Sequence, residues 1–355
     1  MNRLDPRRLH DGRIMLTIAL LVIAVAGGCV ATSALRAGTI GGGPGGSVEL
    51  PEGRQIVFRS LRPGPAFGHI AVLPAADVRR ERAVLPTRCE RAAASPTGGL
   101  CLRQTRNPTQ LFAATLLDGR LRPGEKIPLN GIPSRARVSR DGRYYATTAF
   151  VTGHSYLSDG FSTETVIGRM DGDRDGNRDG NRDGGTVGNI ERFTFLLNGQ
   201  PNQNVDRNVW GVTFVPGGER FFATVATQNR RYLVEGDIGR RTLTALRDNA
   251  ECPSLSPDGR RLVYKKRTGP NADVWRFHVL DLATGAERPL AETRSVDDQA
   301  EWLDDGQVMY AVPKGGAGGR NADVWVTSLR GTAPRLLIPD ADSPTVRTTH
   351  RGRLG

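Results

Sequence analysis

The apolar residues of this chain recur in short alternating stretches, and these stretches come in pairs that flank a tight turn. In the clearest pair, the turn Ser256-Pro257-Asp258-Gly259 separates an apolar segment ending at Leu255 from one beginning at Leu262. Apolar residues two positions apart are typical of strands, not helices, and Asp-Gly supplies the left-handed backbone angles of a tight hairpin. Six copies of this unit are present, with turn glycines at Gly53, Gly98, Gly142, Gly218, Gly259 and Gly306.

The spacing of these turns predicts a repeat fold. The intervals between the glycines are 45, 44, 76, 41 and 47 residues, whereas a four-stranded propeller blade takes ~40 to 50 residues. The interval of 76 residues must therefore hold an insertion. A second repeat supports the same blade length, because Asn271-Ala272-Asp273-Val274-Trp275 recurs as Asn321–Trp325, 50 residues later. The pattern predicts an all-β fold, a six-bladed β-propeller over residues 48–342, followed by a C-terminal tail over residues 343–355.

The repeats resemble those of the TolB-like six-bladed β-propeller family. Blades of that family carry Ser-Pro-Asp-Gly-Arg before apolar residues, then an Asp-x-Trp strand and a Thr-Gly turn, which are matched here by Ser256–Arg260, Asp273–Trp275 and Thr284–Gly285. The resemblance extends over roughly residues 50 to 340 and is closest in kind to the actinobacterial TolB-like translocation proteins. It implies a ring of sheets around a channel whose mouth binds proteins or peptides. TolB itself has an additional amino-terminal domain that is not expected here, so the resemblance does not imply a role in a Tol-type complex.

The amino terminus has the layout of an export signal or membrane anchor over residues 1–28. Four arginines among residues 1–13 precede the apolar run Ile14–Ala26, which is shorter than the ~20 residues of a membrane-spanning helix. Ala26-Gly27-Gly28-Cys29 resembles a lipobox, and a lipobox would make Cys29 the lipidated first residue of the mature chain. An uncleaved anchor and ordinary cleavage near Ala34 are the alternatives. All three place the folded part outside the cytoplasmic membrane, attached to it or secreted, with the glycine-rich stretch 29–47 as a flexible tether.

The remaining cysteines are Cys89, Cys101 and Cys252, and an exported protein could form a disulfide from two of them. Cys89 and Cys101 flank a predicted strand-turn-strand, and an oxidising compartment favours a disulfide between them. The alternative is that both are buried free thiols, as Cys252 would be.

The formal net charge of +12 comes almost entirely from arginine, because the only lysines are Lys126, Lys265, Lys266 and Lys314. The arginines are spread along the chain, whereas a nucleic-acid interface needs a clustered basic face. We therefore expect no nucleic-acid partner. The charge instead favours attraction to an anionic membrane or cell-wall surface.

The long interval contains a low-complexity loop over residues 171–189. Asp171, Asp173 and Asp175 take the first, third and fifth places of a calcium loop, and Asp179 follows in the repeat. Arg182 stands at the twelfth place, where calcium loops have glutamate. The two interpretations are a calcium site and a surface loop without metal.

Four polar residues and one tryptophan stand where the channel-lining strands are expected to begin. Eight positions before the turn glycines stand Glu90, Ser134, Trp210, Glu251 and Asp298. Such residues would form a binding ring at the channel mouth, although solvated strand ends would show the same pattern. His154 is expected in a loop near the channel.

No catalytic constellation is visible in the sequence. It has no Gly-x-Ser-x-Gly motif, no nucleophile-base pair and no histidine at metal-ligand spacing. We therefore expect a scaffold, not an enzyme, that needs no cofactor and binds an envelope or secreted protein or peptide. The alternative is a metal-dependent enzyme, lactonase- or lyase-like, whose channel ligands are scattered along the sequence.

Overall fold

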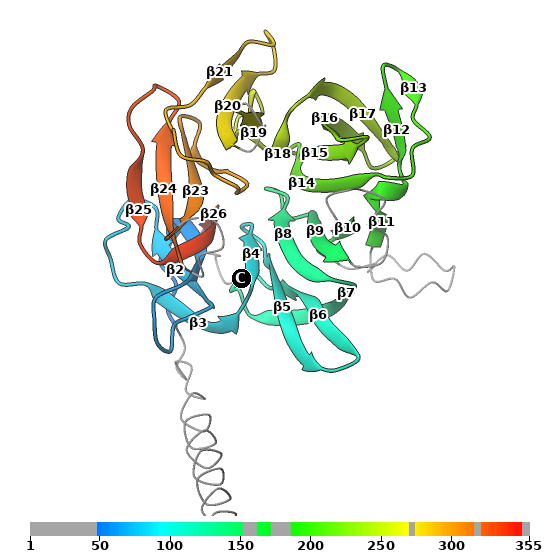
Figure 1. Ribbon diagram of the computed structural model, residues 1–355. Coiled ribbons are helices and arrows are strands. Elements are labelled where there is room, and N and C mark those ends of the chain that lie inside the picture. Colours follow the sequence, from blue (N-terminus) through cyan, green and yellow to red (C-terminus); the bar gives the residue numbers. More distant parts are fainter. Residues whose placement is uncertain (1–47, 152–161, 172–185, 270–273, 316–320, 350–355) are drawn as a thin grey trace, which may run out of the picture. The chain divides into compact units, whose positions relative to one another are not determined.

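Six β-sheets form a ring around a central channel in the computed structural model (Figure 1). The structure describes residues 48–151, 162–171, 186–269, 274–315 and 321–349. Each sheet is one blade, and the predicted six-bladed β-propeller is confirmed.

Blades 2 to 6 follow the order of the chain from the channel to the rim. Blade 2 contains β4 (Arg91–Ala94), β5 (Gly99–Asn107), β6 (Gln110–Leu117) and β7 (Pro123–Leu129). Blade 3 contains β8 (Ile132–Val138), β9 (Tyr144–Val151), β10 (Ser162–Arg169) and β11 (Thr186–Asn189). Blade 4 contains β14 (Asn208–Phe214), β15 (Arg220–Thr227), β16 (Arg230–Asp237) and β17 (Thr242–Asp248). Blade 5 contains β18 (Glu251–Leu255), β19 (Arg261–Thr268), β20 (Val274–Asp281) and β21 (Glu287–Pro289), and blade 6 contains β22 (Glu301–Asp304), β23 (Gln307–Pro313), β24 (Ala322–Ser328) and β25 (Arg335–Ile338).

The predicted tight turns join the first and second strands of these blades. In the turn between β18 and β19, Gly259 has a φ of 71°, which a residue with a Cβ rarely adopts. The Ser256 hydroxyl donates to the Asp258 carboxylate and accepts from the Arg261 backbone N at 2.9 Å. The Ser-x-Asp-Gly pattern thus satisfies polar groups that the turn would otherwise leave unpaired.

Blade 1 is closed by strands from opposite ends of the described chain. β26 (Ala341–Thr349) is innermost and pairs with β1 (Gly53–Ser60), which is followed by β2 (His69–Pro74) and β3 (Ala83–Arg88). Residues 343–349, expected to belong to the tail, are therefore part of a channel-lining strand. The turn pattern did not predict this strand, because no tight turn joins it to its partner. β26 comes before β1 in the order of the blade, but it comes last in the sequence, where β1 comes first.

The insertion in the long interval adds strands to two blades. β11 forms the outer edge of blade 3, so residues 186–189 of the expected loop are a strand. β12 (Thr194–Leu197) pairs in parallel with β17, and β13 (Gln200–Pro201) pairs with β12. Blade 4 is thereby widened to six strands.

A short 3-10 helix, η1 (Ile190–Arg192), ties the insertion to the ring. Its Glu191 Oε1 accepts a hydrogen bond from Thr163 Oγ1 of blade 3 at 2.7 Å and from the Val209 backbone N of blade 4 at 3.3 Å. Burial raises the pKa of Glu191 to about 7, although these hydrogen bonds oppose the shift.

Apolar side chains fill the spaces between blades. Between blades 5 and 6, Phe277 and Tyr310 pack with ring centres 5.0 Å apart, and Trp302 is fully buried beside them. Trp302 Nε1 donates to the Ser254 backbone O at 2.9 Å, so its polar atom is satisfied.

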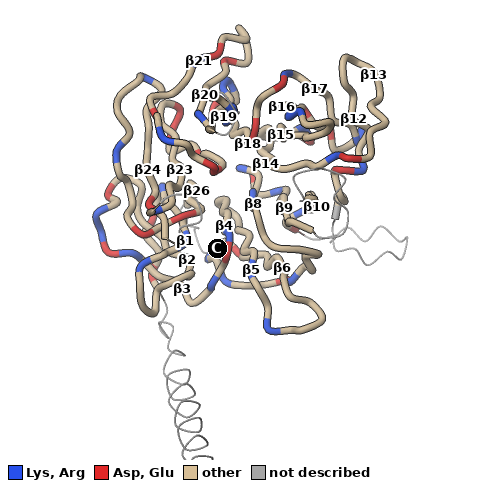
Figure 2. Tube along the Cα trace, in the orientation of Figure 1, with Lys and Arg blue, Asp and Glu red and all other residues tan. Residues whose placement is uncertain are grey.

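Outside these cores, basic and acidic residues are distributed over all the blades (Figure 2). In the described ranges, no helix combines the length and apolar character needed to cross a bilayer. Residues 1–47, with Cys29, lie outside the described part of the chain.

Candidate binding site at the channel mouth

The innermost strands all end at the same mouth of the channel. A pocket of about 380 Å³ at this mouth is lined by the last residues of these strands, including Ala94, Val138, Phe214, Leu255, Asp304 and Thr348. The strands therefore run in one direction and begin at the opposite mouth.

Side chains bridge the channel between its two mouths. Arg137 of blade 3 forms an ion pair with Glu301 of blade 6, which lies across the ring. Gln299 Nε2 donates to the Val212 O at 3.1 Å and to the Pro253 O at 2.8 Å. The cavity left near Arg137 and Gln299 is about 40 Å³, room for little more than one water molecule. Side chains therefore narrow the channel between its mouths, and the cavities at the two mouths are distinct.

The mouth where the strands begin combines aromatic side chains with buried charges. Its cavity, here called the mouth pocket, has a volume of about 330 Å³. Lys265 and Glu251 have side chains only 2% and 5% exposed, whereas Asp297 is 61% exposed. The lining residues are Ser134, Arg135, Phe150, Trp210, Glu251, Lys265, Arg267, Trp275 and Asp297.

Two irregularities in the innermost strands direct residues into the mouth pocket. The pairing register shifts after Trp210 in β14 and after Glu251 in β18. At these points Gly211 has a φ of 69° and Cys252 a φ of 52°, and a Cβ on residue 211 would lie 2.7 Å from the Cys252 Cα. Only glycine fits at position 211. Because a bulge bends its strand and re-aims neighbouring side chains, these irregularities explain why Trp210 and Glu251 reach the pocket.

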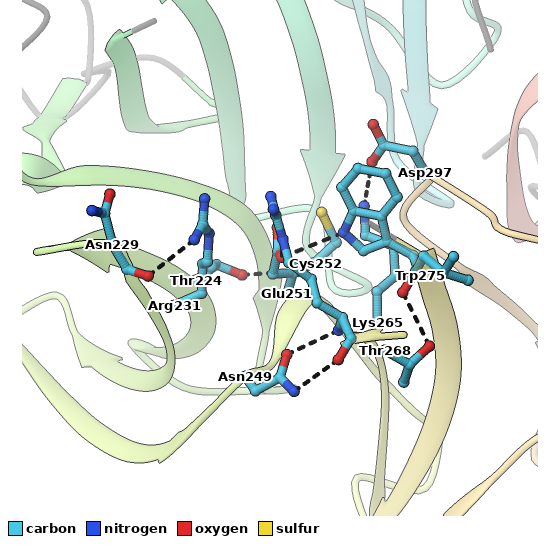
Figure 3. A network of polar contacts seen from close by, with 12 residues as sticks. Thr224, Asn229, Arg231, Asn249, Glu251, Cys252, Lys265, Thr268, Trp275 and Asp297 are labelled. Atoms are coloured by element: carbon cyan, nitrogen blue, oxygen red, sulfur yellow. Dashed lines mark hydrogen bonds and ion pairs between the residues drawn. The ribbon is translucent and has the colours of Figure 1, made fainter. Parts of the chain in front are cut away.

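Glu251 organises one side of the mouth pocket (Figure 3). Its Oε1 accepts from Arg267 Nε at 2.7 Å and from Trp275 Nε1 at 3.4 Å. The Arg267 guanidinium carbon lies 5.0 Å from the centre of the Trp275 ring, and Lys265 Nζ lies 5.4 Å from it. Two cation-π contacts and one hydrogen bond therefore fix the orientation of the Trp275 indole.

Asp297 organises the other side. Its Oδ1 accepts from Lys265 Nζ at 2.5 Å and lies 3.7 Å from Arg135 Nη2. Partial burial would raise the pKa of Asp297, but Lys265 and Arg135 outweigh burial and hold this pKa below its usual value. The carboxylate is thus ionised at neutral pH, and every charged residue that lines the pocket has an opposite charge beside it.

Three residues predicted for the channel mouth meet in this pocket: Ser134, Trp210 and Glu251. Asp298 lies elsewhere, because its Oδ2 accepts from the Ala311 backbone N at 2.9 Å and it lines the small cavity inside the channel. Its neighbour Asp297 occupies the pocket instead.

Glu90 lies in a groove between blades 1 and 2, where it forms an ion pair with Arg59 at 3.6 Å. His154 falls outside the described residues.

Five further residues line the pocket and were not predicted from the sequence: Arg135, Phe150, Lys265, Arg267 and Trp275. Four of them lie outside the innermost strands, on which the prediction was based. Two carried a signal in the sequence, since Trp275 belongs to the repeated Asn-Ala-Asp-Val-Trp segment and Lys265 is one of only four lysines.

The other predicted sites are placed only in part. Cys89 and Cys101 are joined in a disulfide, with Cα atoms 5.4 Å apart, and Cys252 is a buried free cysteine. Of the possible calcium ligands, Asp171 is exposed, whereas Asp173, Asp175 and Asp179 fall outside the described residues. Among the residues that the structure does describe, no three His, Cys, Asp or Glu side chains are grouped closely enough to hold a metal ion.

Comparison with known proteins supports the fold alone. No protein-family model matches the sequence, and no curated protein matches it. The crystal structure of TolB from Acinetobacter baumannii matches with 16% identity over 84% of this chain and 67% of that chain, at a TM-score of 0.52. The chain has a TolB-like fold. A chain of a nidogen/laminin complex matches with 12% identity, over 83% of this chain and 98% of that chain, at a TM-score of 0.50. A putative TolB from Agrobacterium tumefaciens matches with 14% identity over 82% of this chain and 92% of that chain, at a TM-score of 0.49.

Proposed function

We propose that this chain is an exported, membrane-attached propeller that binds a protein or peptide of the cell envelope at the mouth pocket, without catalysing a reaction. The observation that carries the proposal is the pocket itself, a cavity of about 330 Å³ with Phe150, Trp210 and Trp275 around internally paired charges. Aromatic side chains are favoured at the centres of protein interfaces. The pocket has room for a large side chain of a bound partner, which would act as an anchor.

The charges in the pocket favour an apolar or aromatic anchor over a charged one. Arg267 is paired with Glu251, and Lys265 and Arg135 share Asp297. A charged ligand group would have to compete with these pairs, whereas an apolar or aromatic group would leave them intact.

The disulfide supports the exported location within this proposal. Disulfides persist in oxidising compartments and are rare in the cytosol, and Cys89–Cys101 joins the segment after β3 to β5. Attachment to the membrane, through lipid on Cys29 or through an uncleaved segment 1–28, and kinship with the actinobacterial translocation proteins are further parts of the proposal. Mass spectrometry of the full chain and of Cys29→Ser, both purified from membranes, tests the anchor: a lipid-sized mass increase on Cys29 that the variant lacks supports lipidation, and an unmodified Cys29 in the membrane-bound chain contradicts it.

Binding at the mouth pocket is tested with a pair of matched tryptophan variants. Trp275 and Trp325 hold equivalent places in repeated segments of blades 5 and 6, but Trp325 does not line the pocket and stacks instead under Arg294 at 3.9 Å. Peptides selected from a displayed random library on the full chain would be titrated against the wild type, Trp275→Ala and Trp325→Ala. We expect Trp275→Ala to weaken binding at least tenfold and Trp325→Ala to change it less than twofold.

Equal binding by both variants would place the ligand elsewhere and overturn the proposal. The enzymatic alternative is measured on the same preparation, by elemental analysis and by assays on lactone and uronate substrates. Stoichiometric metal together with turnover would favour that alternative over a scaffold.

A further inference from the structure

A second and larger cavity lies on the same face of the propeller as the mouth pocket. It has a volume of about 720 Å³ and runs between blades 1 and 2. Residues at the ends of β1, β5 and β7, together with Glu90 just before β4, line it. Because β4 begins at the mouth-pocket side and neighbouring strands alternate in direction, these ends lie on that side. We call this cavity the blade 1–2 groove.

The groove is strongly basic. Five cations line it, Arg59, Arg88, Arg103, Arg106 and Lys126, with Glu90 as the one acidic lining residue. Arg59 is committed to Asp342 at 2.9 Å and to Glu90 at 3.6 Å. Within the described ranges, none of the other four cations forms an ion pair with an acid.

These four cations differ from the paired charges of the mouth pocket. Arg88, Arg106 and Lys126 are exposed, and Arg103 is half-buried. The Nε of Arg103 is buried with no hydrogen-bond partner among the described atoms. Because the exposed cations of the groove have no acidic partner, an anionic ligand could pair with them without displacing an existing ion pair.

The groove also offers apolar and amide contacts. Phe67, Ile127 and Pro128 contribute apolar surface, and Gln104 and Asn107 contribute side-chain amides. Cys89 lines the groove and its disulfide to Cys101 fixes the crossover from blade 1 to blade 2. The wall is thus held in place before any ligand arrives, which lowers the entropy lost on binding.

We infer that the blade 1–2 groove binds an acidic, partly apolar segment of a partner protein in an extended conformation. Carboxylates of the segment would pair with Arg88, Arg106 and Lys126. Alternate apolar side chains would face Phe67 and Ile127. A bare polyanion could use the cations but would gain nothing from the apolar surface, so the composition of the groove favours a peptide. The inference does not depend on the mouth pocket.

The test is a fluorescence-anisotropy titration of the full chain with a short labelled peptide of alternating glutamate and leucine. The matched peptide with glutamine in place of glutamate and a labelled inorganic polyphosphate are the comparison probes. The first variant is Arg88→Glu with Arg106→Glu, two exposed positions in the groove. The control is Arg330→Glu with Arg335→Glu, two exposed arginines of blade 6 that change the net charge equally.

We expect the glutamate peptide to bind, the groove variant to lose at least tenfold in affinity, and the blade 6 variant to stay within twofold. The neutral pair Arg88→Gln with Arg106→Gln should show a smaller loss in the same direction, which guards against misfolding of the charge-reversed protein. Trp275→Ala should leave this binding unchanged, so failure here is distinct from failure at the mouth pocket. Equal losses in both charge-reversed variants, equal binding of the glutamine peptide, or tighter binding of polyphosphate than of the peptide would each overturn the inference.

Discussion

A buried ion pair connects the closing strand to its neighbours, and Asp342→Ala would break it. Asp342 of β26 lies 2.9 Å from Arg59 of β1 and 3.6 Å from Arg91 of β4. Its side chain is 11% exposed and that of Arg59 is 13% exposed. The carboxylate thus joins the last strand of the described chain to blades 1 and 2.

The expected loss in the free energy of unfolding depends on the interactions that Arg59 and Arg91 retain in the variant. Removing one partner of a buried ion pair costs about 3 to 5 kcal/mol, because the other charge stays buried and uncompensated. Arg59 retains Glu90 at 3.6 Å, and Arg91 retains the Ser134 O at 2.8 Å through its Nε. Burial raises the pKa of Asp342 despite the two arginines, so desolvation already offsets part of the attraction. We therefore expect the low end of the range, about 3 kcal/mol.

The control is an exposed pair of the same chemistry. Asp248 lies 2.6 Å from Arg230, with side chains 58% and 59% exposed, so Asp248→Ala should cost less than about 1 kcal/mol. Equilibrium unfolding in urea, followed by tryptophan fluorescence, gives both values if the slope of the transition is unchanged. Equal losses in the two variants would show that burial of the Asp342 pair does not stabilise the closure.

Three further predictions concern other parts of the ring. A chain ending at Asp340 lacks β26 and its seven paired positions with β1, so urea unfolding followed by tryptophan fluorescence should lose its single cooperative transition; a retained transition would contradict this. Replacing Cys89 and Cys101 together by serine should lower the free energy of unfolding by about 3 kcal/mol, as expected for a short cross-linked loop, and the reduced wild type should match the variant. The pKa of Glu191 is raised from 4.5 to about 7, so its stabilising contribution is full below pH 4.5 and is lost as pH rises through 7; urea titrations should show a loss of roughly 3 kcal/mol across this window. In Glu191→Gln, the free energy of unfolding should vary less with pH over this window. An equal pH dependence in wild type and variant would show that other groups cause the loss.

The blades were predictable because they rest on local patterns. An Asp-Gly turn and alternating apolar residues act within a single hairpin, and their recurrence gave the blade count. The closing strand has no such local signal. β26 pairs with β1 nearly three hundred positions earlier, and only the need to complete blade 1 brings the two together. A boundary at residue 342 is therefore what a local pattern predicts, although it cuts through a channel-lining strand.

Residues of the mouth pocket could be predicted only where the innermost strands keep a constant spacing from their turn glycines. Counting back from the turn glycines found Ser134, Trp210 and Glu251, but it selected Asp298 where Asp297 lines the pocket. A count that is off by one residue exchanges the two faces of an extended segment. Trp275 lies on β20, the third strand of its blade, and its Nε1 donates to Glu251 Oε1 of the innermost strand at 3.4 Å. No spacing rule predicts this contact between strands.

The mouth pocket contains paired charges, whereas the blade 1–2 groove contains cations without acidic partners. This difference affects which ligands each cavity can bind. Binding in the blade 1–2 groove would rely on exposed, unpaired cations, so it should weaken steeply with salt. Binding in the mouth pocket would rely on aromatic surface beside paired charges and should respond little to salt. A partner with an aromatic anchor and an acidic stretch could engage both sites at once, and linkage of two weak contacts can raise affinity by ~10²- to 10⁴-fold without new interactions. Such a partner would lose most of its affinity in either Trp275→Ala or the Arg88/Arg106 charge reversal, whereas a ligand of one site would respond to one change alone.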